Sequence, residues 1–119
     1  MNIDLAKQFS PYPSGRFPSD GTHNGQAFRD DYLMPALVKA KSARGTEKVV
    51  VNIDGVRTFG SSFLEEAFAG LIRKGWFTRD EMERLLVIEC SKPHLMIFKE
   101  SISGYIRAAK PEASSLLHA

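Results

Sequence analysis

The sequence predicts a single α/β domain, a mixed sheet with a parallel core and helices packed on it. Apolar runs typical of buried strands alternate along the chain with segments whose apolar residues recur at helical spacing. The 119 residues, 43% of them hydrophobic, suffice for one ordinary core and are few for two domains. We therefore interpret residues 1–119 as one domain and expect residues 111–119 to be a frayed tail.

The first segments predict an antiparallel element. Residues 3–9 form a weak strand pattern, and residues 10–25 are crowded with Pro, Gly, Ser and Asp, which favour turns. A structureless loop of that length is unusual in a compact domain. We therefore expect residues 15–18 to fold back and pair with the first strand as a hairpin.

An amphipathic helix is expected next, because apolar residues recur at helical spacing at Phe28, Tyr32, Ala36 and Ala40. Asn24 or Thr22 is suited to cap its N-terminus. Pro35 has no amide hydrogen to donate to the Asp31 carbonyl. The helix should therefore bend at Pro35 or begin its regular part there.

The remaining elements alternate between strand and helix. Residues 48–54 (KVVVNID) predict a central strand covered on both faces, and residues 60–75 predict a helix ending at Gly75. A short helix capped by Thr78 and Glu81 leads into a second buried strand over residues 85–90. The last helix, over residues 95–109, is expected to be interrupted at Gly104. This order implies right-handed crossovers and a parallel core pair.

Composition limits the function classes. The net charge of +2 is spread as mixed signs, so no basic stripe favours nucleic acid, and no segment resembles a signal peptide or a membrane span. We expect a cytoplasmic protein. The lone Cys90 forms no internal disulfide and is interpreted as a small core residue. Asp20, His23, Asp30 and Asp31 lack a diagnostic ligand spacing, so we expect neither a metal nor a cofactor.

Two stretches carry a family resemblance. GRFPSDGTHNGQAFRDDYLMPAL followed by VVVNIDGVRTFGSSFLEEAFAGLIRKG resembles the STAS-like family catalogued as a domain of unknown function. The second stretch also resembles true STAS domains, the anti-sigma factor antagonists, in which a strand leads into a serine pair at a helix start. In those antagonists a partner kinase, itself an anti-sigma factor, phosphorylates the second serine. The resemblance thus implies that Ser62 is the phospho-acceptor and Ser61 its neighbour.

The chain departs from the antagonist motif at two positions. Gly60 stands where an Asp is usual, and Phe63 where a small Gly is usual. Both residues alter the surface that a kinase would read. Ser62 also has a purely structural interpretation, because Glu65 three residues later completes a capping box worth about 1 kcal/mol.

A phosphate at Ser62 would lie within about one helical turn of Glu65 and Glu66, whose like charge would make it a signal for release of a partner. Helix capping and regulated phosphorylation are not exclusive, and the sequence leaves both open.

The function predicted from these residues is a non-enzymatic regulatory module that binds a protein. The predicted contact face consists of Gly60, Ser61, Ser62, Phe63, Glu65 and Glu66. The resemblance implies a histidine-kinase-like ATPase as partner, and self-association is left open. The alternative is a small-ligand or nucleotide sensor whose loop would use Arg16, Asp20, Gly21, Thr22, Asn24 and Gly25. A third and weaker hypothesis is a standalone enzyme.

Overall fold

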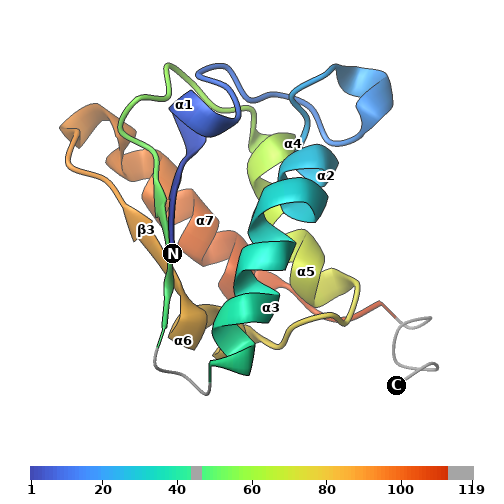
Figure 1. Ribbon diagram of the computed structural model, residues 1–119. Helices are drawn as coiled ribbons and strands as arrows, with labels where there is room; N and C mark the ends of the chain where they lie inside the picture. Colours follow the sequence, from blue (N-terminus) through green and yellow to red (C-terminus); the bar gives the residue numbers. More distant parts are fainter. Residues whose placement is uncertain (44–46, 113–119) are drawn as a thin grey trace.

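Figure 1 shows the computed structural model, which describes residues 1–43 and 47–112. The strands are β1 (Asn2–Asp4), β2 (Val49–Asn52) and β3 (Leu86–Glu89). The helices are α1 (Leu5–Gln8), α2 (Gly25–Phe28), α3 (Met34–Ser42), α4 (Ser61–Leu64), α5 (Gly70–Arg73), α6 (Arg79–Leu85) and α7 (Met96–Ala108). Two 3-10 turns, η1 (Pro18–Asp20) and η4 (Pro93–Leu95), and two π-helical turns, η2 (Arg29–Leu33) and η3 (Glu65–Ala69), complete the described elements.

The sheet is parallel, with the strand order β1-β2-β3. Ile3 pairs with Val51, and Val51 pairs with Ile88. Two right-handed crossovers that step in the same direction place their helices on the same face of a sheet. The long helices accordingly lie on one side (Figure 1), and the strands alternate between buried and more exposed residues. The prediction that β2 is covered on both faces was therefore wrong, whereas its central position was right.

The prediction of an antiparallel hairpin was wrong, because both strand pairs in the described residues are parallel. β1 ends at Asp4, because the Asp4 side chain accepts from the Lys7 amide and starts α1 immediately. The following loop closes on the start of α2 instead of on β1: the Gly25 amide donates to the Gly15 carbonyl and the Gln26 amide to the Arg16 carbonyl. The segment expected to pair with the first strand thus packs against a helix.

The first long helix runs through α2, η2 and α3. Asn24 caps it, since its side-chain oxygen accepts from the Ala27 amide at 2.9 Å. The regular part begins at Met34 with Pro35 in its first turn, as expected for a residue without an amide hydrogen. The wider π turn η2 precedes Pro35, and there the Met34 amide donates to the Arg29 carbonyl.

The second long helix runs through α4, η3 and α5, as predicted, and ends at Gly75 with φ 77°. It crosses α2 at close range. A methyl group on Gly25 would lie 2.8 Å from the Phe63 carbonyl oxygen and 2.9 Å from Glu66 Cβ. Only a glycine lets the two helix backbones approach this closely.

The C-terminal half follows the prediction with two differences. Thr78 and Glu81 form the expected capping box at α6, in which the Glu81 amide donates to Thr78 Oγ1 and the Thr78 amide to Glu81 Oε1. β3 is half exposed instead of buried, because helices cover only one face of the sheet. α7 continues through Gly104 without interruption and ends at Ala108.

No helix in residues 1–43 and 47–112 is long and apolar enough to cross a bilayer. Of the predicted tail, residues 113–119 lie outside the described part of the chain.

Gly25→Ala tests the close helix crossing. We expect a loss of about 1–3 kcal/mol in the free energy of unfolding, measured by urea denaturation, because the new methyl group overlaps backbone atoms. Gly104→Ala is the matched control, since nothing lies within 4 Å of its added methyl group inside α7. That control should gain up to about 1 kcal/mol in helix propensity. Equal effects of the two substitutions would contradict a tight crossing at Gly25.

We expect the folded protein to lose stability in acid, because three of its carboxyl groups have lowered pKa values. Hydrogen bonds lower the pKa of Asp20 chiefly through the Phe17 amide, that of Asp54 through the Ser91 hydroxyl, and that of Glu81 through Lys41. At low pH the unfolded chain therefore binds more protons than the folded chain does. This stability is complete above the ordinary carboxyl pKa of about 4 and is lost as the pH falls through the lowered folded-state values.

Asp54→Asn should therefore reduce the slope of unfolding free energy against pH in urea titrations below about pH 5. Asp31→Asn is the control, because the Asp31 side chain is exposed and accepts no hydrogen bond within the described part of the chain. A wild-type slope in Asp54→Asn would contradict a role for the Asp54–Ser91 hydrogen bonds.

Candidate functional site

The serine pair begins the second long helix. Gly60 is the N-cap residue, with extended backbone angles (φ −79°, ψ 141°) and no side chain to accept a hydrogen bond. Ser61 is exposed and Ser62 is half buried. The prediction that Ser62 caps the helix with Glu65 was wrong, because Ser62 is already inside the first helical turn and the Glu65 carboxylate binds arginines instead. Within residues 1–43 and 47–112, neither serine hydroxyl forms a hydrogen bond with another protein group.

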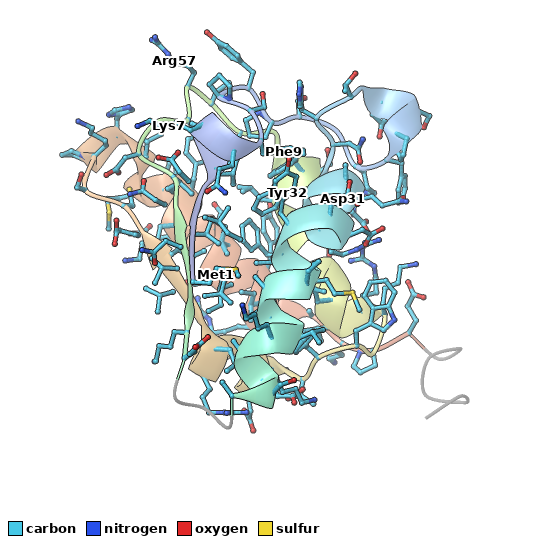
Figure 2. The ribbon with its side chains drawn as sticks, in the orientation of Figure 1. Met1, Lys7, Phe9, Asp31, Tyr32 and Arg57 are labelled. Atoms are coloured by element: carbon cyan, nitrogen blue, oxygen red, sulfur yellow. The ribbon has the colours of Figure 1, made fainter. Side chains whose placement is uncertain are left out.

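A loop lies across the start of this helix. The Gly60 amide donates to the Pro13 carbonyl at 3.3 Å and the Arg57 amide to the Pro11 carbonyl at 2.8 Å. Phe9 anchors the preceding chain, packing edge-on against Tyr32 with 5.4 Å between ring centroids (Figure 2). The loop then exposes two aromatic side chains, Tyr12 at 61% and Phe17 at 44%. Exposed aromatic rings thus flank the point where the loop meets Gly60.

Beneath the loop, the side chain of Glu66 is buried at 1% exposure and binds three arginines. Its Oε2 accepts from Arg29 Nη1, and its Oε1 accepts from Arg16 Nη1 at 3.0 Å and from Arg73 Nη2 at 2.6 Å. The Arg29 side chain is equally hidden, at 3% exposure. A buried charge is tolerated only when paired and hydrogen-bonded, and this carboxylate has all its charge compensated.

Glu65 extends the network toward the surface. Its two carboxylate oxygens bind Arg16 and Arg73, and 27% of its side chain is exposed. The hydrogen bond to Glu65 is the main reason that the pKa of Arg16 is raised. A surface cleft of about 300 Å³ lies beside these ion pairs. Its lining residues are Arg16, Phe17, Glu65, Glu66, Arg73, Lys74 and Glu112.

Two local features accommodate the buried ion pair formed by Arg29 and Glu66. A methyl group on Gly70 would lie 2.9 Å from Arg29 Nη1 and 3.2 Å from Glu66 Oε2, so only glycine leaves space for the guanidinium. Arg29 opens the π turn η2, and Glu66 lies in the π turn η3. π turns within α-helices often mark functional positions.

The predicted contact face is divided by this arrangement. Ser61 is exposed, whereas Gly60, Ser62 and Glu65 are half buried. Phe63 is fully buried and packs near Phe28 and Phe59, and Glu66 is enclosed by arginines. The side chains of these two residues are therefore not exposed on the predicted face.

The alternative ligand loop uses its own polar groups internally. Asp20 Oδ2 accepts from the Arg16 and Phe17 amides, and the Asn24 amide group donates to the Gly21 carbonyl. The Gly25 amide is bonded to the Gly15 carbonyl. Gly21 and Thr22 are exposed. The amides that would cradle an anion at the start of α2 are therefore already occupied.

Within residues 1–43 and 47–112, no group of three or more His, Cys, Asp or Glu side chains is placed to hold a metal ion. Every buried side-chain nitrogen or oxygen in that part of the chain has a hydrogen-bond partner. The described polar interior is therefore fully satisfied.

Comparison with known protein families identifies a match. Residues 24–95, more than half of the chain, match the model of a family described as a STAS-like domain of unknown function. The chain belongs to this family. The resemblance inferred from the sequence is thereby confirmed over α2 to η4, which includes the serine pair and both members of the buried pair. No curated protein and no solved structure matches significantly.

Sequence reasoning missed Arg29, although a signal for it existed. Arg29 lies four and eight residues before Leu33 and Leu37, so it falls on the apolar stripe of its helix. Glu66 likewise lies four residues before Gly70 and three after Phe63, on the buried side of the second helix. Opposite charges on two apolar stripes that pack together predict a buried ion pair.

Glu66→Ala tests the network. Removing the carboxylate leaves the buried Arg29 guanidinium unpaired, so we expect a loss of about 3–5 kcal/mol of unfolding free energy in urea titrations. Glu65→Ala is the matched control and should cost about 1 kcal/mol or less, because its side chain is partly solvated. The double substitution Arg29→Met, Glu66→Leu should recover most of the loss. A Glu66→Ala effect no larger than that of Glu65→Ala would refute the central role of Glu66.

Proposed function

We propose that this STAS-like domain is a non-enzymatic regulatory module that binds a protein partner, and that phosphorylation of Ser62 controls the binding. The observation that carries the proposal is the pair of serines at the helix start, one exposed and one half buried, whose hydroxyls form no hydrogen bond within the described part of the chain. A serine that caps its own helix would have a structural role, and here Gly60 occupies that position. The Ser62 hydroxyl thus has no capping role, which is consistent with a role in phosphorylation.

The surroundings of the serine pair suit a protein interface. Tyr12 and Phe17 are exposed on the loop that meets Gly60, and aromatic residues are enriched where interfaces gain most of their energy. Arg57 is exposed at the same end of the molecule as Lys7 (Figure 2) and adds a basic rim. We therefore place the contact face on Gly60, Ser61, Ser62, Glu65 and this loop.

The partner that we propose is a histidine-kinase-like ATPase, on the strength of the resemblance to anti-sigma factor antagonists. Such an ATPase would act as both binding partner and kinase. A phosphate at Ser62 adds about −1.5 to −2 charges to the centre of the contact face. A partner that binds this face would have to desolvate the added charge next to Glu65, and this cost disfavours association, so the modified form is the released form.

A phosphotransfer assay tests the proposal. The purified chain is incubated with radiolabelled ATP and a histidine-kinase-like ATPase encoded near its gene, and label incorporation is measured. We expect Ser62→Ala to abolish labelling and Ser61→Ala, the matched control, to retain it. Neither substitution should change stability by more than about 0.5 kcal/mol, because neither hydroxyl caps the helix.

Calorimetry with the same ATPase tests the consequence of the charge. Ser62→Asp should bind at least about tenfold more weakly than Ser62→Ala, which corresponds to roughly 1.4 kcal/mol. Labelling of Ser62→Ala, or equal affinities of the two variants, would count against a switch at Ser62.

A further inference from the structure

Ser62 shares one helix face with Glu65 and Glu66. Residues three and four positions apart are neighbours on a helix surface, with about 5–6 Å between their Cβ atoms. Glu65 is three positions and Glu66 four positions after Ser62. The Ser62 side chain therefore projects one turn N-terminal to the gap between the two carboxylates.

Arg16 reaches that same gap from the loop. A single nitrogen, Nη1, donates to both Glu65 Oε1 and Glu66 Oε1, so it lies between the two carboxylates. The Arg16 backbone comes from the N-terminal end of the helix, because a methyl group on Gly60 would lie 3.7 Å from the Gly15 amide nitrogen. The long Arg16 side chain thus runs along the face that carries Ser62.

Arg16 is also the arginine that can change partners at least cost. Its side chain is 33% exposed, compared with 24% for Arg73 and 3% for Arg29. If Arg16 leaves, Glu65 keeps its bond to Arg73, and Glu66 keeps Arg73 and Arg29. The buried part of the network therefore survives its departure.

We propose that Arg16 is the internal receptor for phosphorylated Ser62 and exchanges Glu65 for the phosphate. This inference rests on the proposed function, which supplies the modification. In that step the terminal phosphoryl group of ATP forms a P–O bond to Ser62 Oγ while its bond to ADP breaks, and the hydroxyl proton passes to a base of the kinase. The phosphate carries up to twice the charge of a carboxylate, and arginine binds it through two parallel hydrogen bonds.

The exchange links the modification to the shape of the contact face. Arg16 lies next to Phe17 and four residues after Tyr12, on the loop that presents both exposed rings. In the unmodified chain this loop is tied to the helix through Glu65, and in the phosphorylated chain it is tied to the serine itself. Phosphorylation would thus rearrange the aromatic side chains of the face as well as change its charge.

Phosphorus NMR tests the contact without any partner. The chain is produced with phosphoserine incorporated at position 62 during translation, and the second ionisation of the phosphate, ordinarily near pKa 6, is titrated. We expect Arg16→Gln to raise this measured pKa by roughly one unit, because a nearby guanidinium favours the doubly charged phosphate. Arg84→Gln is the matched control, since Arg84 is an exposed arginine on α6, at the far end of the molecule from α4 (Figure 1).

Glu65→Gln provides a second variant with the opposite sign. It removes the competing carboxylate, so the phosphate pKa should fall below that of the parent phosphorylated chain, and it also serves if Arg16→Gln does not fold. A phosphate pKa that Arg16→Gln leaves unchanged, or one that fails to fall in Glu65→Gln, would overturn the proposal. The readout is independent of the ATPase, so failure of partner binding or phosphotransfer leaves it unaffected, and its own failure leaves the phosphotransfer assay standing.

Discussion

The buried pair of Arg29 and Glu66 is the interaction on which the rest of this structure depends. It lies where the two long helices cross, where Gly25 permits the close approach and Gly70 leaves space for the Arg29 guanidinium. Enclosing two charges carries a large desolvation cost that only good geometry and further hydrogen bonds offset. Glu66 meets that requirement with arginines from three different segments of the chain.

This requirement also fixes the relative position of those segments. A hydrophobic contact tolerates sliding, whereas a carboxylate with three arginine partners has one arrangement that satisfies all of them. Arg29 sets the rotation of the first long helix, Arg73 comes from the last turn of the second, and Arg16 brings the loop over the helix start. The serine pair thus begins a helix that these buried ion pairs hold in place. The loop that carries Arg16 lies over the start of this helix and is only partly buried.

The central strand, the α6 capping box and the helix start at Asn24 were predictable because each rests on local spacing. The hairpin prediction failed because the Asp4 side chain starts a helix and ends the first strand. The turn-rich loop that follows packs against the start of α2 instead. The Ser62 cap failed because the helix begins at Ser61, and a shift of two residues removes a cap. The site itself depends on contacts between segments that are far apart in sequence. The local sequence indicates these contacts only through Arg29 and Glu66, two charged residues on the apolar stripes of their helices.

The strand pairing has a consequence for the order in which the chain assembles. The Met1 amine donates to the Lys48 carbonyl, 47 residues away, and β2 reaches β3 only after another long crossover. The hydrogen bonds between parallel strands therefore form only after large loops have closed at an entropic cost, and such topologies fold slowly. Contacts within and between the helices that meet at Gly25 need smaller loops to close. We therefore expect the parallel sheet to form after the helices have met.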